Sequence, residues 1–310
     1  MSRIDVHQHL LPDAYVRRLN AEGIAQAGGR DLPAWSVEGA IALMDDHSIA
    51  TGVLSLSTPG THLGDDARAL DLAREINDFG AELVKDRPDR FGHFATVPLP
   101  YVDGAVQESV RALDELGADG VVLLANSRGT YLGDPAFDPL MAELGRRSAV
   151  VLVHPAELPA PAVPGLPPFA ADFLLDTTRA AANLVLHGIP RRHPGLKIIL
   201  SHAGGFLPYA AHRIAVTLVG QGHDPGEVFE DLASFYFDTA LSGSPAALPS
   251  LLAFARPGHV LFGSDWPFAP DAAVKYFTDG LDAFTADDED LHQAIDSANA
   301  LALFPRLAGH

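Results

Sequence analysis

Ile4-Asp5-Val6-His7-Gln8-His9 opens the chain with a short apolar run that ends in two histidines. Side chains on a strand alternate between its two faces, so residues two apart share a face. His7 and His9 are therefore expected to project together from the end of a first strand. Short apolar runs without strict alternation are typical of strands that are buried on both faces, as in parallel sheets.

Runs of the same kind recur along the chain and alternate with longer amphipathic stretches. The predicted strands are Ile4–His9, Thr51–Ser57, Phe91–Val97, Gly120–Leu124, Val150–His154, Ile198–His202, Phe235–Thr239 and Val260–Ser264. The predicted helices are Val37–His47, Ala67–Asp86, Gly104–Leu116, Pro135–Arg147, Ala171–His187, Phe206–Val219, Pro245–Ala255, Ala272–Phe284 and a final one from Asp287 to Leu303. This alternation predicts an α/β protein in which residues 1–310 form a single (β/α)8 barrel domain, with an open doubly wound sheet as the alternative.

Two segments interrupt the alternation. Leu11–Ala34 contains a Gly-Gly pair and a proline among charged residues, and Pro155–Pro168 contains six prolines, which forbid a regular helix. We therefore expect irregular insertions after strands one and five. Because loops after barrel strands build the active face, both insertions are expected to be pocket walls, and the second also a semi-rigid lid.

Composition limits the classes of function. The 310 residues are 47% apolar, carry a formal net charge of −19 and include no cysteine. The charge argues against a nucleic-acid partner, since phosphate binding needs clustered Lys and Arg. Without cysteine there is neither a disulfide nor a thiolate ligand. The apolar runs are far shorter than a membrane span and no signal segment opens the chain, so we expect a cytoplasmic protein without a membrane partner.

Several predicted strands end in residues that bind metals. His7 and His9 end the first strand, His154 ends the fifth, and Asp265 follows the eighth. The carboxyl ends of barrel strands meet at one rim, so these side chains should converge there. Three imidazoles and a carboxylate suit Zn²⁺ or a similar divalent ion with one position left open, as in catalytic sites. Taken singly, Asp265 could instead cap a helix and His154 could be a buried histidine bonded to the backbone. The combination of four favours the metal site.

His202 ends the sixth predicted strand, within Ser201-His202-Ala203-Gly204-Gly205. The two glycines would let a ligand approach the backbone closely. His202 is then either a fifth ligand or an acid/base group beside the metal, and both roles stay open. Most other histidines, among them His93 at the opposite rim, are expected to be solvated or core residues.

Together these motifs resemble the amidohydrolase superfamily and, within it, the branch of metal-dependent decarboxylases. The resemblance runs nearly end to end. It rests on Asp5–His9, Leu56–Thr58, Tyr131–Pro135, His154-Pro155, Ser201–Gly205, Gly263–Pro267 and Asn299-Ala300. The resemblance implies that His7, His9, His154 and Asp265 hold one divalent ion per chain, Zn²⁺ first and Mn²⁺ as the alternative. It also implies that His202 works beside that ion.

The resemblance also bears on metal number and substrate. Many hydrolases of the superfamily bridge two metals with a modified lysine that ends strand four; Gly120–Asn126 has no lysine, which indicates a mononuclear site. One decarboxylase of the branch holds a substrate carboxylate with an arginine of the neighbouring subunit, eleven residues after the strand-six histidine, and Arg213 has this spacing. A substrate-binding Arg213 and a homodimer are thereby implied. A second arginine of that enzyme has no counterpart in Glu38–Met44, which favours an aromatic monocarboxylate.

Three functional hypotheses follow. The first is non-oxidative decarboxylation of a hydroxybenzoate-like or related unsaturated carboxylic acid, with the metal as Lewis acid, Asp265 as proton donor to the ring carbon and His202 assisting. The second keeps the site but has a metal-activated water attack a lactone or amide, with His202 or Asp265 as base. The third is a barrel that binds metal or ligand without turnover, against which the full ligand set argues.

Overall fold

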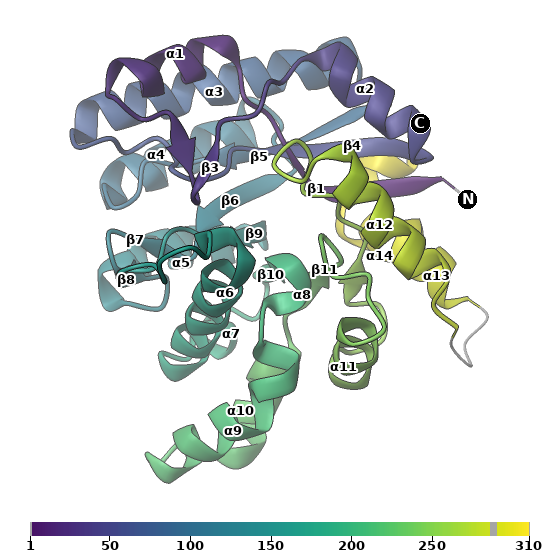
Figure 1. The fold of residues 1–310 in the computed structure, drawn as a ribbon. Coiled ribbons are helices and arrows are strands. Elements are labelled where there is room, and N and C mark those ends of the chain that lie inside the picture. Colours follow the sequence, from purple (N-terminus) through teal and green to yellow (C-terminus); the bar gives the residue numbers. More distant parts are fainter. Residues whose placement is uncertain (1, 286–289, 310) are drawn as a thin grey trace.

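Eight parallel strands follow one another around a barrel in sequence order (Figure 1). The computed structural model describes residues 2–285 and 290–309. The barrel strands are β1 (Arg3–His9), β4 (Ile49–Ser55), β5 (Phe91–Thr96), β6 (Gly120–Leu124), β9 (Val150–His154), β10 (Lys197–Leu200), β11 (Tyr236–Asp238) and β12 (Val260–Leu261). The segment after β12 returns to β1, where Val6 N–H donates to the carbonyl of Phe262 (3.0 Å) and Asp265 N–H to that of His7 (2.7 Å). The barrel is confirmed and the open-sheet alternative is wrong.

Helices cover the outside of the barrel and connect its strands (Figure 1). They are α1 (Asp13–Ala21), α2 (Val37–Asp46), α3 (Asp66–Asp86), α4 (Val102–Asp114), α5 (Asp138–Arg146), α6 (Pro168–Leu186), α7 (Ile189–Arg192), α8 (Ser201–Gly204), α9 (Leu207–Gly220), α10 (Pro225–Ala233), α11 (Ala247–Phe254), α12 (Asp271–Asp282), α13 (Leu291–Gln293) and α14 (Asn299–Leu303). A π-helix (Ala294–Ala298) lies between α13 and α14, and short 3-10 helices cover Pro135–Phe137 and Pro305–Gly309. Of the predicted final helix, residues 287–289 lie outside the described part of the chain. No helix within residues 2–285 and 290–309 has both the length and the hydropathy needed to cross a bilayer.

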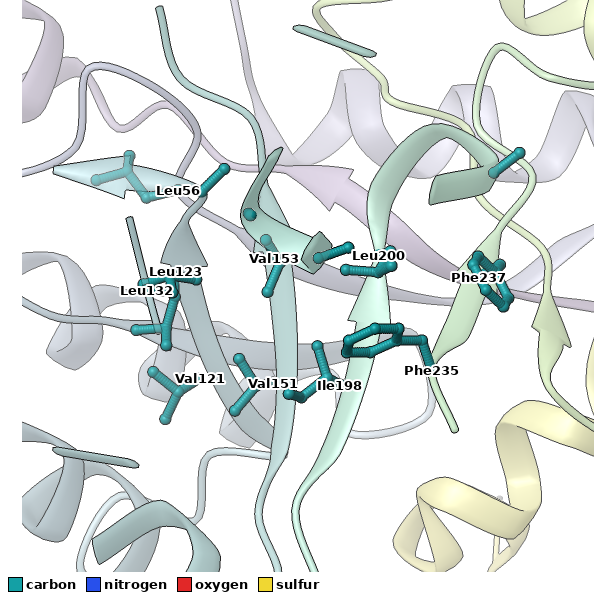
Figure 2. Packing of buried hydrophobic residues seen from close by; sticks show 14 of the residues in the cluster. Leu56, Val121, Leu123, Leu132, Val151, Val153, Ile198, Leu200, Phe235 and Phe237 are labelled. Atoms are coloured by element: carbon teal, nitrogen blue, oxygen red, sulfur yellow. The ribbon is translucent and has the colours of Figure 1, made fainter. Parts of the chain in front are cut away.

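Apolar side chains pack on both faces of the barrel sheet. Figure 2 shows the layer between strands and helices, which includes Val121, Leu123, Val151, Val153, Ile198, Leu200, Phe235 and Phe237. Alternate residues of the same strands form a second cluster in the barrel interior, among them Val122, Val150, Leu152, Ile199 and Leu261. Burial on both faces explains why the strand sequences are continuously apolar.

The C-terminal segment closes one end of the barrel. Leu303, Phe304 and Leu307 belong to the interior cluster. Arg306 pairs with Asp119 (2.8 Å), which precedes β6, and also donates to the carbonyl of Phe91 at the start of β5 (3.3 Å). These contacts lie where strands begin. The opposite rim, where the strands end, is left for a site.

The segment after β1 differs from the prediction. Leu11–Ala34 is not an irregular insertion, because it contains the helix α1 and a hairpin of β2 (Gln26–Ala27) and β3 (Arg30–Asp31). Tyr15 and Leu19 of α1 are buried, and this apolar spacing of four residues was overlooked among the charges. The hairpin tip packs against α6 so closely that a Cβ on Gly28 would lie 2.4 Å from Phe173, and one on Gly29 would lie 2.5 Å from Pro168.

The proline-rich segment after β9 has no regular structure before α6 begins at Pro168, as predicted. A further hairpin, which was not predicted, follows β6. It consists of β7 (Asn126–Ser127) and β8 (Thr130–Tyr131). Both this hairpin and the β2–β3 hairpin lie at the rim where strands end, so the rim carries more ordered structure than the sequence indicated.

His93 is a core residue, as expected, and we expect its burial to make the fold sensitive to acid. Both ring nitrogens are buried without a hydrogen-bond partner in the described part of the chain. Burial lowers the pKa of His93 to about 4, against a small opposing effect of Asp119. As the pH falls below about 6.5, His93 takes up a proton in the unfolded chain but stays neutral in the folded chain. The folded state therefore loses stability between pH 6.5 and 4.

We expect His93→Leu to reduce this loss. The difference in the free energy of unfolding between pH 7 and pH 4.5 should be about 2 kcal/mol smaller than in the wild type, because the shift of the His93 pKa no longer contributes. Urea titrations at the two pH values measure it. His223→Leu, at a partly exposed site in the α9–α10 loop, is the control. Equal acid sensitivity of His93→Leu and wild type would contradict the prediction.

Candidate metal centre

The four predicted ligands meet at the rim where the strands end. One ligand atom from each of His7, His9, His154 and Asp265 lies within 4.8 Å of all the others, and all four residues are buried. His7 Nε2 is 3.1 Å from His9 Nε2, and Asp265 Oδ1 lies 3.0 Å from His9 Nε2 and 3.3 Å from His7 Nε2. Residues up to 258 positions apart are thus brought together by the barrel. Such a set suits one divalent metal ion.

The other ring nitrogens show which way the lone pairs face. His7 Nδ1 is 2.7 Å from Asp238 Oδ2, His9 Nδ1 is 3.2 Å from the carbonyl of Ser55, and His154 Nδ1 is 2.8 Å from the carbonyl of Pro155. Each Nδ1 therefore carries the proton that these acceptors require. The Nε2 atoms of His7 and His9 then face Asp265 Oδ1, at 3.3 Å and 3.0 Å, and His154 Nε2 lies 3.5 Å from the hydroxyl oxygen of Ser57. A cation satisfies this arrangement, so the donor set fits the metal.

Asp238, at the end of β11, was not among the predicted site residues. It is fully buried, and while Oδ2 faces His7, Oδ1 accepts from the backbone N–H of His202 (2.8 Å) and of Ala240 (3.0 Å). One carboxylate thus orients a metal ligand and the segment that carries His202. The available signal was a carboxylate at the end of a predicted strand, the same signal that had identified Asp265.

Asp5 performs a similar task for Asp265. Its Oδ1 accepts from the backbone N–H of His7 and of Ser264, both at 3.0 Å, and its Oδ2 from the hydroxyl of Ser264 (2.5 Å). β1 is thereby bonded to the segment that carries Asp265. Burial raises the pKa of Asp5 to about 6, against the lowering effect of the bond from Ser264. Gly263 permits the close approach of the two segments, since a Cβ there would lie 2.9 Å from His7 Cβ.

Two predicted strands end earlier than expected. β10 ends at Leu200, so His202 lies not at a strand end but in α8, whose backbone is non-helical at this residue; β12 ends at Leu261, and Asp265 lies beyond its strand, as expected. His202 has φ +54° and Asp265 φ +63°, a left-handed conformation that is unfavourable for residues with a Cβ. Strained residues persist only where surrounding bonds hold them, as Asp238 holds His202 and β1 holds Asp265. In this conformation the side chains of His202 and Asp265 lie beside the predicted histidine ligands.

The glycines after His202 do not face the metal site, contrary to expectation. A Cβ on Gly205 would lie 2.0 Å from the carbonyl oxygen of Leu174 in α6, and one on Gly204 would lie 2.8 Å from Phe237. They allow the turn to pack against its neighbours. His202 lies next to the four-residue cluster, with Nε2 3.6 Å from Asp265 Oδ2.

The charges favour a cation at this position. Burial by itself lowers the pKa of His7, but Asp238 and Asp265 outweigh it and raise the pKa to about 10. Burial lowers the pKa of both His9 and His154. Burial alone would raise the pKa of Asp265, but hydrogen bonds from His202, His7 and His9 lower it well below the ordinary range. Asp265 is therefore a carboxylate in the free protein and a suitable metal ligand.

A cavity of about 280 Å³ opens onto this cluster. His154, His202 and Asp265 line its polar side. Its apolar walls include four phenylalanines, namely Phe169, Phe173, Phe268 and Phe277. A small cavity with aromatic walls and convergent polar groups suits one aromatic ring with a polar edge.

Arg30, in the β2–β3 hairpin, also lines this cavity. Its guanidinium lies 5.0 Å from the ring centre of Phe169, a cation–π contact that helps to hold it there. The sequence predicts an irregular segment here and carries no signal that singles out Arg30. It is the one residue with a permanent positive charge among those that line the cavity in the described part of the chain.

Arg213, in contrast, does not line this cavity. It lies exposed on α9, which with α10 projects away from the barrel (Figure 1). Tyr209 and Val216 are exposed on the same helix at 89% and 68%. Since positions 209, 213 and 216 are three or four apart, they share one face of α9. The predicted role of Arg213 in a neighbouring subunit's site stays a prediction.

Comparison with known proteins places this geometry in a family. The model of the amidohydrolase family matches residues 4–306. The chain belongs to the amidohydrolase family. This amidohydrolase is 40% identical to the 6-methylsalicylic acid decarboxylase of Penicillium expansum over 319 residues, which cover 100% of this chain and 98% of the relative.

Solved structures agree with the family assignment. A crystal structure described as amidohydrolase II is 34% identical, with a TM-score of 0.92 and coverage of 98% of this chain and 100% of that one. A dihydroxybenzoic acid decarboxylase from Polaromonas sp. JS666, solved with bound manganese and the inhibitor 2-nitroresorcinol, is 25% identical, with a TM-score of 0.76 and coverage of 98% and 97%.

Proposed function

We propose that this amidohydrolase is a metal-dependent carboxy-lyase that removes CO₂ from a hydroxybenzoate-like acid. The observation that carries the proposal is the convergence of His7, His9, His154 and Asp265 beside a cavity with aromatic walls, which His154 and Asp265 line. The decarboxylase relatives support the reaction class. Zn²⁺ is our first choice of metal and Mn²⁺, which the Polaromonas enzyme contains, the alternative.

The reaction exchanges a carboxylate for a proton at one ring carbon. When bound, the divalent ion supplies a Lewis acid that orients the substrate's hydroxyl and carboxylate. The phenylalanine walls hold the ring and exclude water. Asp265, assisted by His202, delivers the proton to the carbon that carries the carboxylate. The C–CO₂ bond then breaks, its electron pair returns to the ring, and aromaticity is restored.

The pKa of Asp265 is the critical quantity for this role. Three imidazoles keep it low in the free protein. A bound substrate brings negative charge and removes water, and both effects raise the pKa of a neighbouring carboxyl group. Asp265 can then hold a proton beside the ring, and His202 Nε2, 3.6 Å from Asp265 Oδ2, can exchange one with it.

The decisive experiment is product analysis of metal-loaded protein with salicylate and resorcylate analogues. Decarboxylation releases one CO₂ and the corresponding phenol without uptake of water. Hydrolysis of lactones or amides on the same site consumes water and yields no CO₂. Absence of CO₂ from all hydroxybenzoates, together with turnover of a lactone or an amide, would replace the proposal by the hydrolase alternative.

Arg30 is proposed to neutralise the substrate carboxylate from the hairpin side of the cavity. We expect Arg30→Met to raise KM about 10- to 100-fold with a smaller change in kcat, because charge-assisted bonds contribute about 1.5–3 kcal/mol. Arg30→Lys should recover part of the loss, since it keeps the charge but not the planar fork. Steady-state kinetics measures both. Arg17→Met, at an exposed arginine of α1, is the matched control, and an unchanged KM in Arg30→Met would contradict the assignment.

Arg213 is proposed to enter the cavity of a partner subunit in a homodimer. If it does, each site needs both subunits. Mixing inactive His202→Asn subunits with inactive Arg213→Ala subunits should then restore part of the activity, because a mixed dimer contains one intact composite site. Native mass spectrometry verifies mixing, and CO₂ release measures recovery. A fully active monomer, or no recovery in verified mixed dimers, would exclude the shared site.

A further inference from the structure

A second, larger cavity opens at the same rim of the barrel, beside the cavity at the metal ligands. Its volume is about 630 Å³, against about 280 Å³ for the first cavity. Its walls come from the ends of β4, β5 and β6 and from the segment that follows β9. Ala27 and Thr58 line both cavities, so the two adjoin at these residues.

Part of the wall of the second cavity is apolar, and buried polar residues such as Thr61 and Asn126 line it as well. Leu56, Val97, Leu99 and Leu123 line it, and each is at most 8% exposed in the chain as a whole. At Gly60 the wall has no side chain, and a Cβ at this position would lie 3.1 Å from the side chain of Leu124. An apolar ligand group that covers these side chains removes their surface from water, and this burial favours binding.

Polar residues surround the outer edge of the same cavity. Gln26, Arg128 and Glu157 line it and are exposed. An apolar group that extends from the metal side would pass Ala27 and Thr58, contact the apolar part of the wall and end near these exposed residues.

We propose that the substrate is a hydroxybenzoate with an alkyl substituent of several carbons, and that this substituent occupies the second cavity. The inference rests on the proposed function, since the ring and its carboxylate are taken to sit at the metal ligands. The first cavity, of about 280 Å³, holds the ring between its phenylalanines, and the substituent extends into the adjoining second cavity. The substrate class is thus an alkylsalicylate and not a bare salicylate.

Equilibrium binding tests the inference on metal-loaded wild-type protein. Dissociation constants are measured by calorimetry for salicylate, 6-methylsalicylate and 6-pentylsalicylate. Each methylene that leaves water strengthens binding up to about fourfold. After the cost of ordering the chain, we expect 6-pentylsalicylate to bind at least about tenfold more tightly than 6-methylsalicylate. Equal or weaker binding of the pentyl compound would overturn the inference.

Two variants that fill the second cavity locate the substituent. Leu124→Phe enlarges a half-buried side chain of its wall, and Val97→Phe does so at a second position in case the first variant misfolds. Each should weaken binding of the pentyl compound about tenfold and leave the methyl compound unchanged. Ala170→Phe, at an exposed residue that lines the first cavity, is the matched control and should weaken all three ligands. Equal effects of the filling variants on all ligands would place the substituent elsewhere and reject the inference.

CO₂ release, measured in parallel, separates this inference from the proposed function. Tighter binding of the pentyl compound without CO₂ from any ligand would support the substrate class and reject decarboxylation. CO₂ release from salicylate and 6-methylsalicylate without a preference for the pentyl compound would support decarboxylation and reject the second cavity as a substrate site.

Discussion

His7→Ala should empty the metal site and abolish turnover. The imidazole supplies one of four ligands, and its removal also leaves Asp238, which is fully buried, without the partner at 2.7 Å that now neutralises it. We expect the metal affinity to fall by at least about 100-fold, more than the 10- to 100-fold that losing a group behind a ligand costs. Elemental analysis after dialysis measures bound metal per chain, expected to be one ion in the wild type.

A graded series makes this test specific. Asp238→Asn keeps the shape of the side chain but removes the charge behind His7, so its metal affinity should lie between those of the wild type and His7→Ala. His223→Ala, far from the site in sequence and partly exposed, should keep its metal and activity. Circular dichroism verifies that the barrel remains folded. Two ions per wild-type chain, or undiminished metal in folded His7→Ala, would disprove the site.

His202→Asn should keep the metal and lose turnover. His202 lies outside the four-residue cluster, and its Nε2 lies 3.6 Å from Asp265 Oδ2. A positioned group that transfers a proton contributes about 10²- to 10⁴-fold to the rate, so kcat should fall by that factor. KM and bound metal should change little. If the metal leaves together with the imidazole, His202 is a fifth ligand and its proposed role is wrong.

The two variants distinguish binding from proton transfer at one site. His7→Ala loses activity because the metal leaves, and added metal at high concentration should recover part of it. His202→Asn loses activity with the metal in place, so added metal should not help. A pH profile of the remaining activity that equals the wild-type profile in His202→Asn would contradict the transfer of a proton through this residue.

Several residues of the site were predictable because they follow local rules. Val150–His154 is a continuous apolar run that ends in a ligand, and β9 has these same bounds. Parallel strands of a barrel end at one rim, so His7, His154 and Asp265 had to converge there. Where the backbone departs from regular strand geometry the prediction of local structure was wrong, as at His202, which was expected to end a strand and instead has a positive φ angle.

Other residues depend on contacts between distant segments. Arg30 has no signal of its own within a polar stretch. It reaches the cavity because Gly28 and Gly29 pack against Phe173 and Pro168 of α6. The pairing of His7 with Asp238 likewise joins residues that are 231 positions apart. Neither contact could be derived from spacing, since no periodicity relates a hairpin to the helix that it packs against.

The sequence by itself therefore predicted the barrel, the four residues of the candidate metal site and the absence of thiolate chemistry, because strand-end residues and composition carry that information directly. Only the tertiary structure decided which cationic side chain lines the cavity beside the candidate metal site, which carboxylate orients His7 and His202, and where a second cavity adjoins the first. These properties arise from packing between segments, and packing depends on volumes and distances that a one-dimensional pattern does not contain.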